Sequence, residues 1–166
     1  MRVLILTGPP AVGKSTIGRL LAGERPRAAF IDIDDVRHLV VGGHAAPWSG
    51  QEGLRQQRLG VLNGCALARN FLDGDIDVVM VDVLTDSTAE LYRASLPDVL
   101  ILKLEVDFRE AERRAGTRPV HLTPEEFRAL HDQQGEFTGD DIRLDVSRLS
   151  AEDAAARVRD IWVGHH

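Results

Sequence analysis

Two kinds of hydrophobic pattern alternate along this chain of 166 residues. Short apolar runs rich in β-branched residues are typical of buried strands, and they lie at residues 3–6, 28–33, 76–83, 99–106 and 142–146. The segments between and after them carry apolar residues at helical spacing, at residues 17–22, 36–41, 51–72, 87–95, 108–114, 124–134 and 150–163. Strands separated by helices predict an α/β fold with a five-stranded, mostly parallel sheet and helices on both faces.

The longest helical segment, residues 51–72, is expected to bury one apolar face. Its members are Leu54, Leu59, Leu62, Cys65, Ala66, Phe71 and Leu72. Gly60 and Gly64 are expected to weaken this helix, because glycine has a low helix propensity.

Two later helices carry capping signals at their N-termini. Thr123 is followed by Pro124 in the first turn and by Glu126 three residues on, which is typical of a capping box. Ser150 and Asp153 have the same spacing. These signals predict where the two helices begin.

The segment that joins the first strand to the first helix satisfies the P-loop pattern G-x-x-x-x-G-K-[ST]. It reads Gly8-Pro9-Pro10-Ala11-Val12-Gly13-Lys14-Ser15, followed by Thr16. Backbone N–H groups of such a loop, together with the positive end of the following helix, bind phosphate oxygens. Lys14 is expected to reach the β- and γ-phosphates, and the Ser15 hydroxyl to ligate Mg²⁺. The plain alternative is a Gly/Pro turn that only connects a strand to a helix.

We therefore predict a three-layer P-loop NTPase fold that binds ATP. The expected nucleotide-binding residues in the loop are Gly8, Pro9, Ala11, Val12, Gly13, Lys14, Ser15 and Thr16. In such sheets ligands bind beyond the carboxyl ends of the strands, so the other strand ends are the places to search.

Acidic residues follow two of the predicted strands. The second strand is expected to end at Asp34 and Asp35, and Asp34 is the candidate base that accepts or orients the proton of an attacking hydroxyl. The alternative is that either aspartate only caps the next helix. Asp82, after the third strand, is the candidate Mg²⁺ ligand, unless it is simply a polar residue leaving the sheet. Asp32 is expected at the sheet surface or in a hydrogen-bonded niche.

Arginines gather after the fourth strand, in a predicted lid at about residues 109–122. Arg114 and Arg118 are the preferred contacts to the transferring phosphate, whose negative charge arginines commonly stabilise. Gly116 and Pro119 interrupt the helix there, which suits a lid that moves. The alternative is a solvated helix face, in which acidic neighbours pair with the arginines.

The segment at residues 42–50 is rich in turn-forming residues and contains His44 and Trp48. Loops on a rigid scaffold often carry binding residues, so both side chains are candidates for contact with the acceptor. The alternative for Trp48 is that it only fills the core.

Composition narrows the class of protein. The length fits a single domain, residues 1–166. The formal net charge of -6 argues against binding nucleic acid through bulk electrostatics, although a small basic groove is compatible with it. One cysteine, Cys65, cannot form an intramolecular disulfide. The sequence shows no signal-peptide pattern before the first apolar run and no apolar stretch of membrane-spanning length, so the expected location is the cytoplasm.

The order of these features resembles a group of small P-loop kinases. The group includes chloramphenicol phosphotransferase, the kinase domain of polynucleotide kinases, zeta-toxin-like kinases and, more distantly, gluconate and shikimate kinases. Besides the P-loop, Asp34-Asp35-Val36-Arg37 looks like the D-D-x-R element of polynucleotide kinases, and Val81-Asp82 resembles the third-strand aspartate of the group. The segment at residues 113–119 resembles the group's arginine lid.

The resemblance implies ATP, Mg²⁺ and an acceptor hydroxyl, with Asp34 as base and Arg37 on the acceptor side. It also implies that Ser147, after the fifth strand, lies near the adenine ring. The loop at residues 42–50 matches no member of the group closely, and neither the shikimate kinase nor the gluconate kinase acceptor signature is evident.

These observations lead to an ATP-dependent phosphotransferase as the first hypothesis. Its catalytic residues would be Asp34, Lys14, Arg37 and Arg118, and its acceptor would be a small molecule with a hydroxyl group, such as an antibiotic or another metabolite. A polynucleotide or nucleotide kinase is the second hypothesis, and a nucleotide-dependent switch or slow ATPase is the third. The sequence leaves the acceptor and the oligomeric state open.

Overall fold

The computed structural model describes residues 3–117 and 122–164. Within these ranges its elements follow in the order that the hydrophobic pattern predicts. They are β1 (Val3–Thr7), α1 (Lys14–Gly23), β2 (Ala28–Asp32), α2 (Ile33–Arg37), α3 (Gly50–Asp73), β3 (Asp77–Val81), α4 (Asp86–Ser95), β4 (Val99–Glu105), α5 (Phe108–Ala115), α6 (Pro124–Glu136), β5 (Ile142–Asp145) and α7 (Ala151–Gly164).

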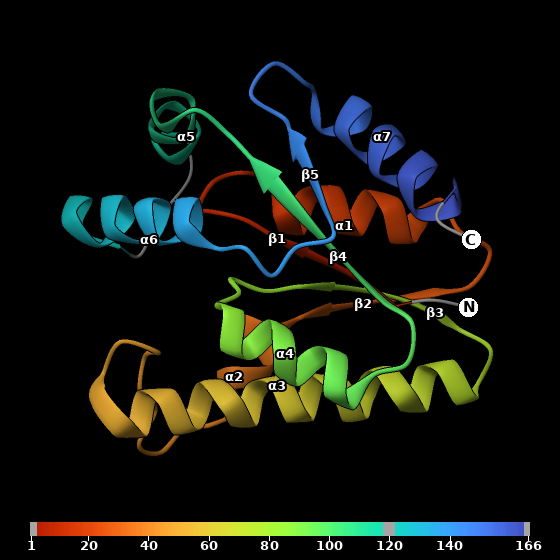
Figure 1. Ribbon diagram of the computed structural model, residues 1–166, viewed down its shortest axis with the longest axis horizontal. Helices are drawn as coiled ribbons and strands as arrows, with labels where there is room; N and C mark the ends of the chain where they lie inside the picture. The colour runs from red at the N-terminus through yellow and green to blue at the C-terminus, as the bar shows by residue number, and fades with distance from the viewer. Residues whose placement is uncertain (1–2, 118–121, 165–166) are drawn as a thin grey trace.

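The five strands form one sheet in the order β2-β3-β1-β4-β5, and all neighbouring pairs are parallel. The central strand, β1, pairs Leu6 with Val81 of β3 on one side and with Leu102 of β4 on the other. Figure 1 shows the strands running in the same direction between two layers of helices. The predicted α/β architecture is confirmed.

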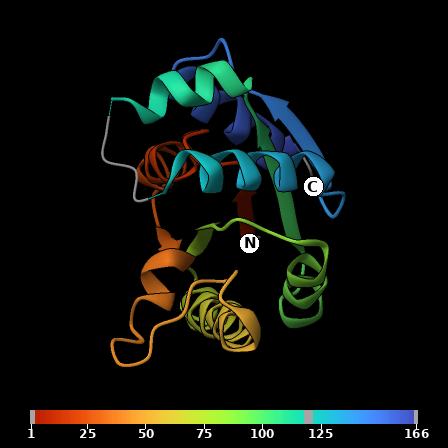
Figure 2. The ribbon, with the colours of Figure 1, turned by 90° about the vertical axis from the view of Figure 1, so that its left-hand side faces the viewer.

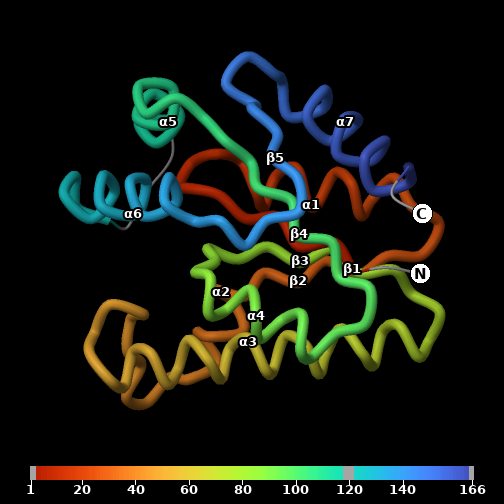
Figure 3. The backbone as a smooth tube through the Cα atoms, in the orientation of Figure 1, coloured from red at the N-terminus to blue at the C-terminus, as the bar shows by residue number. Residues whose placement is uncertain are grey.

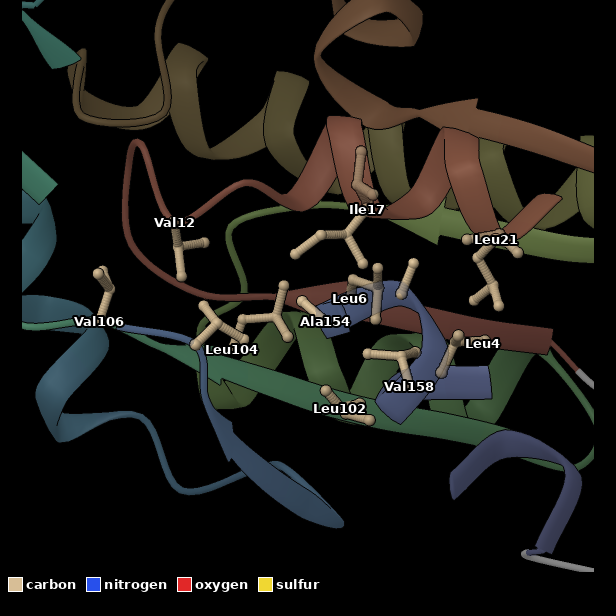
Figure 4. Packing of buried hydrophobic residues seen from close by; sticks show 14 of the residues in the cluster. Leu4, Leu6, Val12, Ile17, Leu21, Leu102, Leu104, Val106, Ala154 and Val158 are labelled. Carbon is tan, nitrogen blue, oxygen red and sulfur yellow. The ribbon is translucent and has the colours of Figure 1, made fainter. Parts of the chain in front are cut away.

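The core consists of two clusters, one on each face of the sheet. Along β1, Leu4 and Leu6 belong to the cluster under α1 and α7, whereas Val3 and Ile5 belong to the cluster under α3 and α4. This alternation follows from the two-residue period of a strand. Figure 4 shows the first cluster, in which Leu4 and Leu6 lie near side chains of α1, β4 and α7.

The buried face of α3 agrees only in part with the predicted face, since Cys65 is buried and Phe71 and Leu72 pack against the core, but the predicted leucines nearer its start are exposed. Leu54 is 53% exposed, and Leu59, Leu62 and Leu67 are exposed as well. The helix instead buries a stripe of small and amide side chains, made of Gly53, Gln56, Gln57, Gly60, Val61, Gly64, Cys65 and Ala68.

Close approach of α2 explains this correction. A Cβ atom at Gly60 would lie 2.6 Å from Cγ of Arg37, and one at Gly64 would collide with Ile33. Because glycine has no side chain, α2 can pack directly against α3 at these positions. The glycines that lower the helix propensity of α3 therefore form its contact with α2.

The region around α2 also differs from the prediction. β2 ends at Asp32 rather than at Asp34 and Asp35, and the predicted helix at residues 36–41 begins earlier, at Ile33, and ends at Arg37. Asp32 is the N-cap, and its carboxylate accepts the backbone N–H of Asp34 at 3.1 Å. The capping role considered for Asp34 or Asp35 therefore belongs to Asp32, and both later aspartates lie in the first turn.

The two predicted capping signals are confirmed. The Thr123 hydroxyl accepts the N–H of Glu126, and the Glu126 carboxylate accepts the N–H of Thr123. The Ser150 hydroxyl likewise accepts the N–H of Asp153 at 3.0 Å. Between α2 and α3 the chain forms a loop beside the start of α3, which can be followed in Figure 3.

Candidate active site

The phosphate-binding loop lies at the carboxyl edge of the sheet, between β1 and α1, and Figure 2 views this edge face on. Gly8 has a φ of +143°, and a Cβ there would collide with the carbonyl oxygen of Leu104 in β4. Only glycine fits such a close approach with this backbone conformation. The Lys14 ammonium donates to the carbonyl oxygens of Gly8 at 2.8 Å and Pro9 at 3.0 Å. The loop and its lysine therefore form one folded unit.

The hydroxyl of Ser15 faces a carboxylate from the end of β2. It donates to Oδ2 of Asp32 at 2.9 Å, while the other Asp32 oxygen caps α2. Partial burial raises the pKa of Asp32 above its ordinary value, and the bond from Ser15 opposes that shift. Sequence reasoning did not give Asp32 a role at the site, although its place at a strand end, two residues before Asp34, was an available signal.

Three charged side chains contact one another in a row, two from α2 and one from the residue that follows β3. Arg37 forms ion pairs with Oδ1 of Asp34 and, at 3.8 Å, with Oδ1 of Asp82. Asp34 is exposed, at 56% of its side chain, whereas Asp82 is buried. The two predicted acceptor-side residues, Asp34 and Arg37, thus contact each other, with Asp82 behind Arg37.

Asp82 is held from two further directions. Its Oδ2 accepts the hydroxyl of Tyr92 in α4 at 2.9 Å, and its Oδ1 accepts the backbone N–H of Val83 at 2.8 Å. Burial raises the pKa of Asp82 to about 6, against the lowering effects of Arg37 and Tyr92. Asp82 was the predicted partner of Ser15 at the metal, but its described contacts are with Arg37, Tyr92 and Val83. The carboxylate that accepts the Ser15 hydroxyl is that of Asp32.

A cavity of about 400 Å³ lies beside the P-loop, between α5 and the connection from β5 to α7. Val12, Gly13, Thr16, Arg114 and Ser147 are among the residues that line it. The structure therefore brings these five predicted nucleotide-binding residues together around one pocket.

Arg114 connects three parts of this pocket. Its guanidinium donates to the carbonyl oxygens of Val12 at 3.2 Å and Val146 at 2.9 Å, and to the carboxylate of Glu110 at 2.8 Å. Hydrogen bonds from Arg113 and Arg114 lower the pKa of Glu110 to about 2. The predicted lid contact Arg118, and the lid residues around it at 118–121, lie outside the described residues.

A larger cavity of about 610 Å³ lies on the other side of the P-loop, between α6 and the ends of β4 and β5. Lys103, only 2% exposed, lines it and lies 3.4 Å from the carbonyl oxygen of Phe137. Gln134 lines it as well and links Thr7 of β1 to the carbonyl of Leu84. Sequence reasoning missed both buried polar residues, because a lysine inside an apolar strand and a glutamine in a helix carry no motif.

The loop between α2 and α3 is held mainly by Gln56 of α3, whose amide bonds the carbonyl of Gly43 and the N–H of Ala45. The His44 ring lies 4.9 Å from that of His38. Trp48 is 55% exposed, so it does not fill the core. Neither His44 nor Trp48 lines the two cavities described above, and their contact with an acceptor stays a prediction.

The sequence is similar to that of known kinases. It is 32% identical over 174 aligned residues to shikimate kinase from Saccharopolyspora erythraea, an alignment that covers 92% of this chain and 97% of the relative. No protein-family model matches the chain.

Solved kinase structures share the fold. A sugar kinase from Janibacter sp. HTCC2649 superposes with a TM-score of 0.77 at 15% identity, covering 99% of this chain and 95% of the other. Shikimate kinase from Bacteroides thetaiotaomicron superposes with a TM-score of 0.72 at 16% identity, covering 97% and 98%.

The fold, the P-loop and the carboxylates around it define a P-loop kinase. The chain belongs to the family of small P-loop kinases that includes shikimate kinase. It is an ATP-dependent phosphotransferase that acts on a hydroxyl group of a small molecule. The similarity supports this wider class rather than the chloramphenicol phosphotransferase and zeta-toxin group in particular. Among residues 3–117 and 122–164, no helix is long and apolar enough to cross a membrane.

Proposed function

We propose that this kinase uses Mg²⁺-bound ATP to phosphorylate an uncharged polyhydroxyl compound, with Asp34 facing the acceptor hydroxyl. The observation that carries the proposal is the arrangement of two carboxylates around the P-loop. Asp32 meets the P-loop hydroxyl of Ser15, and exposed Asp34 follows it on the first turn of α2. One carboxylate thereby serves the nucleotide and the other the acceptor.

The nucleotide side rests on Lys14, Ser15 and Asp32. Mg²⁺ prefers oxygen ligands, usually keeps several waters and needs only one or two protein side chains besides phosphates. The hydroxyl of Ser15 and the carboxylate of Asp32, 2.9 Å apart, fit that donor set. Bound there, the ion neutralises charge on the phosphates. We therefore assign the metal-supporting role to Asp32, in place of the Asp82 that the sequence suggested.

On the acceptor side, Asp34 accepts or orients the proton of the attacking hydroxyl, which places that oxygen in line with the γ-phosphate. Arg37 holds the Asp34 carboxylate through its ion pair. In the proposed lid, at about residues 109–122, Arg114 exchanges its carbonyl partners for phosphate oxygens, and Arg118 approaches the transferring group. These arginines stabilise the negative charge that spreads over the phosphoryl oxygens.

The charge around Asp34 points to an acceptor without a negative charge. Both terminal nitrogens of Arg37 are engaged, one by Asp34 and the other by Asp82. Two carboxylates thus face one guanidinium, so a carboxylate on the acceptor would meet repulsion rather than a free arginine. The relatives are named for shikimate. Shikimate carries a carboxylate, so it is a natural acceptor to compare with an uncharged one.

The test is ADP release by the purified protein with matched pairs of acceptors, such as shikimate against its methyl ester and gluconate against glucose. We expect a higher kcat/KM for the uncharged member of a pair. A higher kcat/KM for shikimate than for its ester would overturn the acceptor class and leave phosphotransfer intact. Absence of acceptor-stimulated ADP release across a broad set of uncharged polyols would count against the proposed reaction itself.

A polynucleotide kinase is the second candidate, favoured by the contact between Asp34 and Arg37 within the D-D-x-R segment. The net charge of -6 opposes it. Transfer from labelled ATP to an oligonucleotide with a 5′-hydroxyl, at a rate that falls steeply as salt rises, would support this candidate.

A further inference from the structure

The Arg37 side chain is fixed along its whole length. Its stem packs against α3 at Gly60, where a Cβ would lie 2.6 Å from Cγ of the arginine. Only 12% of the side chain is exposed, and the guanidinium lies between buried Asp82 and exposed Asp34. An arginine held by packing and by two carboxylates has little rotamer freedom left to lose when an acceptor binds.

The inner partner of Arg37 is itself anchored by the fold. The carboxylate of Asp82 accepts the Tyr92 hydroxyl at 2.9 Å and the Val83 N–H at 2.8 Å. Tyr92 has no exposed surface and comes from α4, and it bonds Oδ2 of Asp82, whereas Arg37 of α2 pairs with Oδ1. A tyrosine hydroxyl in the core usually finds a partner, and here the partner is the residue behind Arg37.

We propose that Tyr92 and Asp82 are positioning residues, which hold Arg37 in the orientation that presents Asp34 to the acceptor. This inference rests on the proposed role of Asp34. The chain of contacts runs from Tyr92 through Asp82 and Arg37 to Asp34, from the core to the surface. Both positioning residues are buried, at 4% exposure for Asp82 and 0% for Tyr92, so each would act through Arg37.

The hydroxyl of Tyr92 is what ties this chain of contacts to the core. Without it, Oδ2 of Asp82 loses its donor, and the carboxylate can rotate about the bond to Val83. Arg37 then loses a fixed partner on its inner side and keeps only the exposed carboxylate of Asp34. A small loss of orientation at the reacting group is sufficient to slow transfer, because catalysis depends on near-attack geometry.

The experiment measures Arg37 directly, by nitrogen-15 NMR of arginine side chains in the full chain. Restricted rotation of the guanidinium gives separate signals for its terminal nitrogens. We expect restricted rotation in the parent protein and rotation at least about tenfold faster in Tyr92→Phe and Asp82→Asn. The signals of Arg114 serve as an internal reference, since its partners are Glu110 and backbone carbonyls in another part of the site.

Kinetics supply the second readout. Tyr92→Phe should lower kcat for ATP hydrolysis, in which water takes the place of the acceptor hydroxyl at Asp34, about tenfold. KM for ATP should stay within about twofold of the parent value, because the nucleotide side is untouched. Ser87→Ala is the matched control, because it removes another hydroxyl from α4 that bonds Thr85 rather than Asp82. It should change neither the Arg37 signals nor kcat.

Unchanged rotation of Arg37 in both Tyr92→Phe and Asp82→Asn would overturn the inference. So would faster rotation with an unchanged kcat for hydrolysis, since the orientation of Arg37 would then have no effect on attack by the water that takes the place of the acceptor. The NMR result does not depend on phosphotransfer. Failure of the proposed function would appear separately, as near-normal transfer by Asp34→Asn while Arg37 of the parent protein still shows restricted rotation.

Discussion

The two halves of the proposed active site, one for the nucleotide and one for the acceptor, are built in different ways. The nucleotide half consists mostly of consecutive backbone, from Gly8 to Ser15, and its lysine folds back onto the carbonyls of its own loop. The acceptor half is a chain of side chains, in which Asp34 and Arg37 of α2 meet Asp82 beyond β3 and Tyr92 of α4. A contiguous loop binds a group common to all kinases, namely phosphate, whereas an assembled set of side chains can change with the acceptor.

The largest expected effect is on the nucleotide half. Lys14→Ala should lower turnover about 10³-fold, because no other P-loop side chain supplies a cation to the β- and γ-phosphates. ADP release measures this loss. Arg19→Ala is the control, since Arg19 lies on the same helix but packs over the ring of Phe30. Retention of turnover by Lys14→Ala would mean that the loop does not act on the phosphates.

The acceptor half should respond differently. Asp34→Asn should slow transfer at least about hundredfold, since a general base contributes 10²- to 10⁴-fold. KM for ATP should stay unchanged, because Asp34 does not contact the nucleotide loop in the described structure. Asp35→Asn, which alters the exposed neighbour, should transfer phosphate at close to the parent rate. Near-normal transfer by Asp34→Asn would remove it as the base.

Burial of Asp82 predicts a pH dependence of stability. The folded pKa of about 6 lies above the ordinary value of 3.8 for an aspartate, so the folded protein binds more protons than the unfolded chain between these values. The contribution of Asp82 to the unfolding free energy is therefore fully present below pH 3.8 and is lost as pH rises through about 6. Compared with Asp82→Asn, the parent protein should lose about 2 kcal/mol of unfolding free energy between pH 4 and pH 7.

Denaturant unfolding of both proteins across this pH range measures the difference. Subtracting the two curves cancels groups that titrate alike in both proteins. A difference that stays constant from pH 4 to pH 7, or that changes in the opposite direction, would show that Asp82 is not destabilised as an ion in the folded state.

The smallest expected effect separates the two candidate metal carboxylates. Asp32→Asn should raise the Mg²⁺ concentration for half-maximal turnover about tenfold, equivalent to about 1.4 kcal/mol, because a ligand charge is lost. Asp82→Asn should leave that concentration unchanged while lowering kcat. The reverse pattern would restore Asp82 as the metal carboxylate and place Asp32 in a capping role only.

Helix α3 illustrates how far the hydrophobic pattern carries. Its position and length were predicted well, but Leu54, Leu59 and Leu62 were wrongly assigned to its buried face, because an apolar pattern counts leucines as core residues and passes over glycines. The buried face is determined by the close approach of Arg37 and Ile33 to Gly60 and Gly64. A pattern of single residues does not contain the distance between two helices.

The same limit applies to the carboxylates. Asp34 was recognised because it follows an apolar strand and belongs to a short motif with Arg37. Asp32 was not, because its contact with Ser15 joins residues 17 positions apart in separate elements. The Tyr92 hydroxyl likewise acquires a role only through its contact with Asp82, ten residues away along the chain.

The sequence by itself determined the parallel α/β architecture, the P-loop and the class of reaction, because strand and helix periods and a contiguous phosphate-binding motif are local properties of a chain. Only the tertiary structure decided which carboxylate meets Ser15, which face of α3 is buried and what stands behind Arg37. Those contacts depend on how closely separate elements pack, and that distance is set by side chains brought together from distant parts of the sequence.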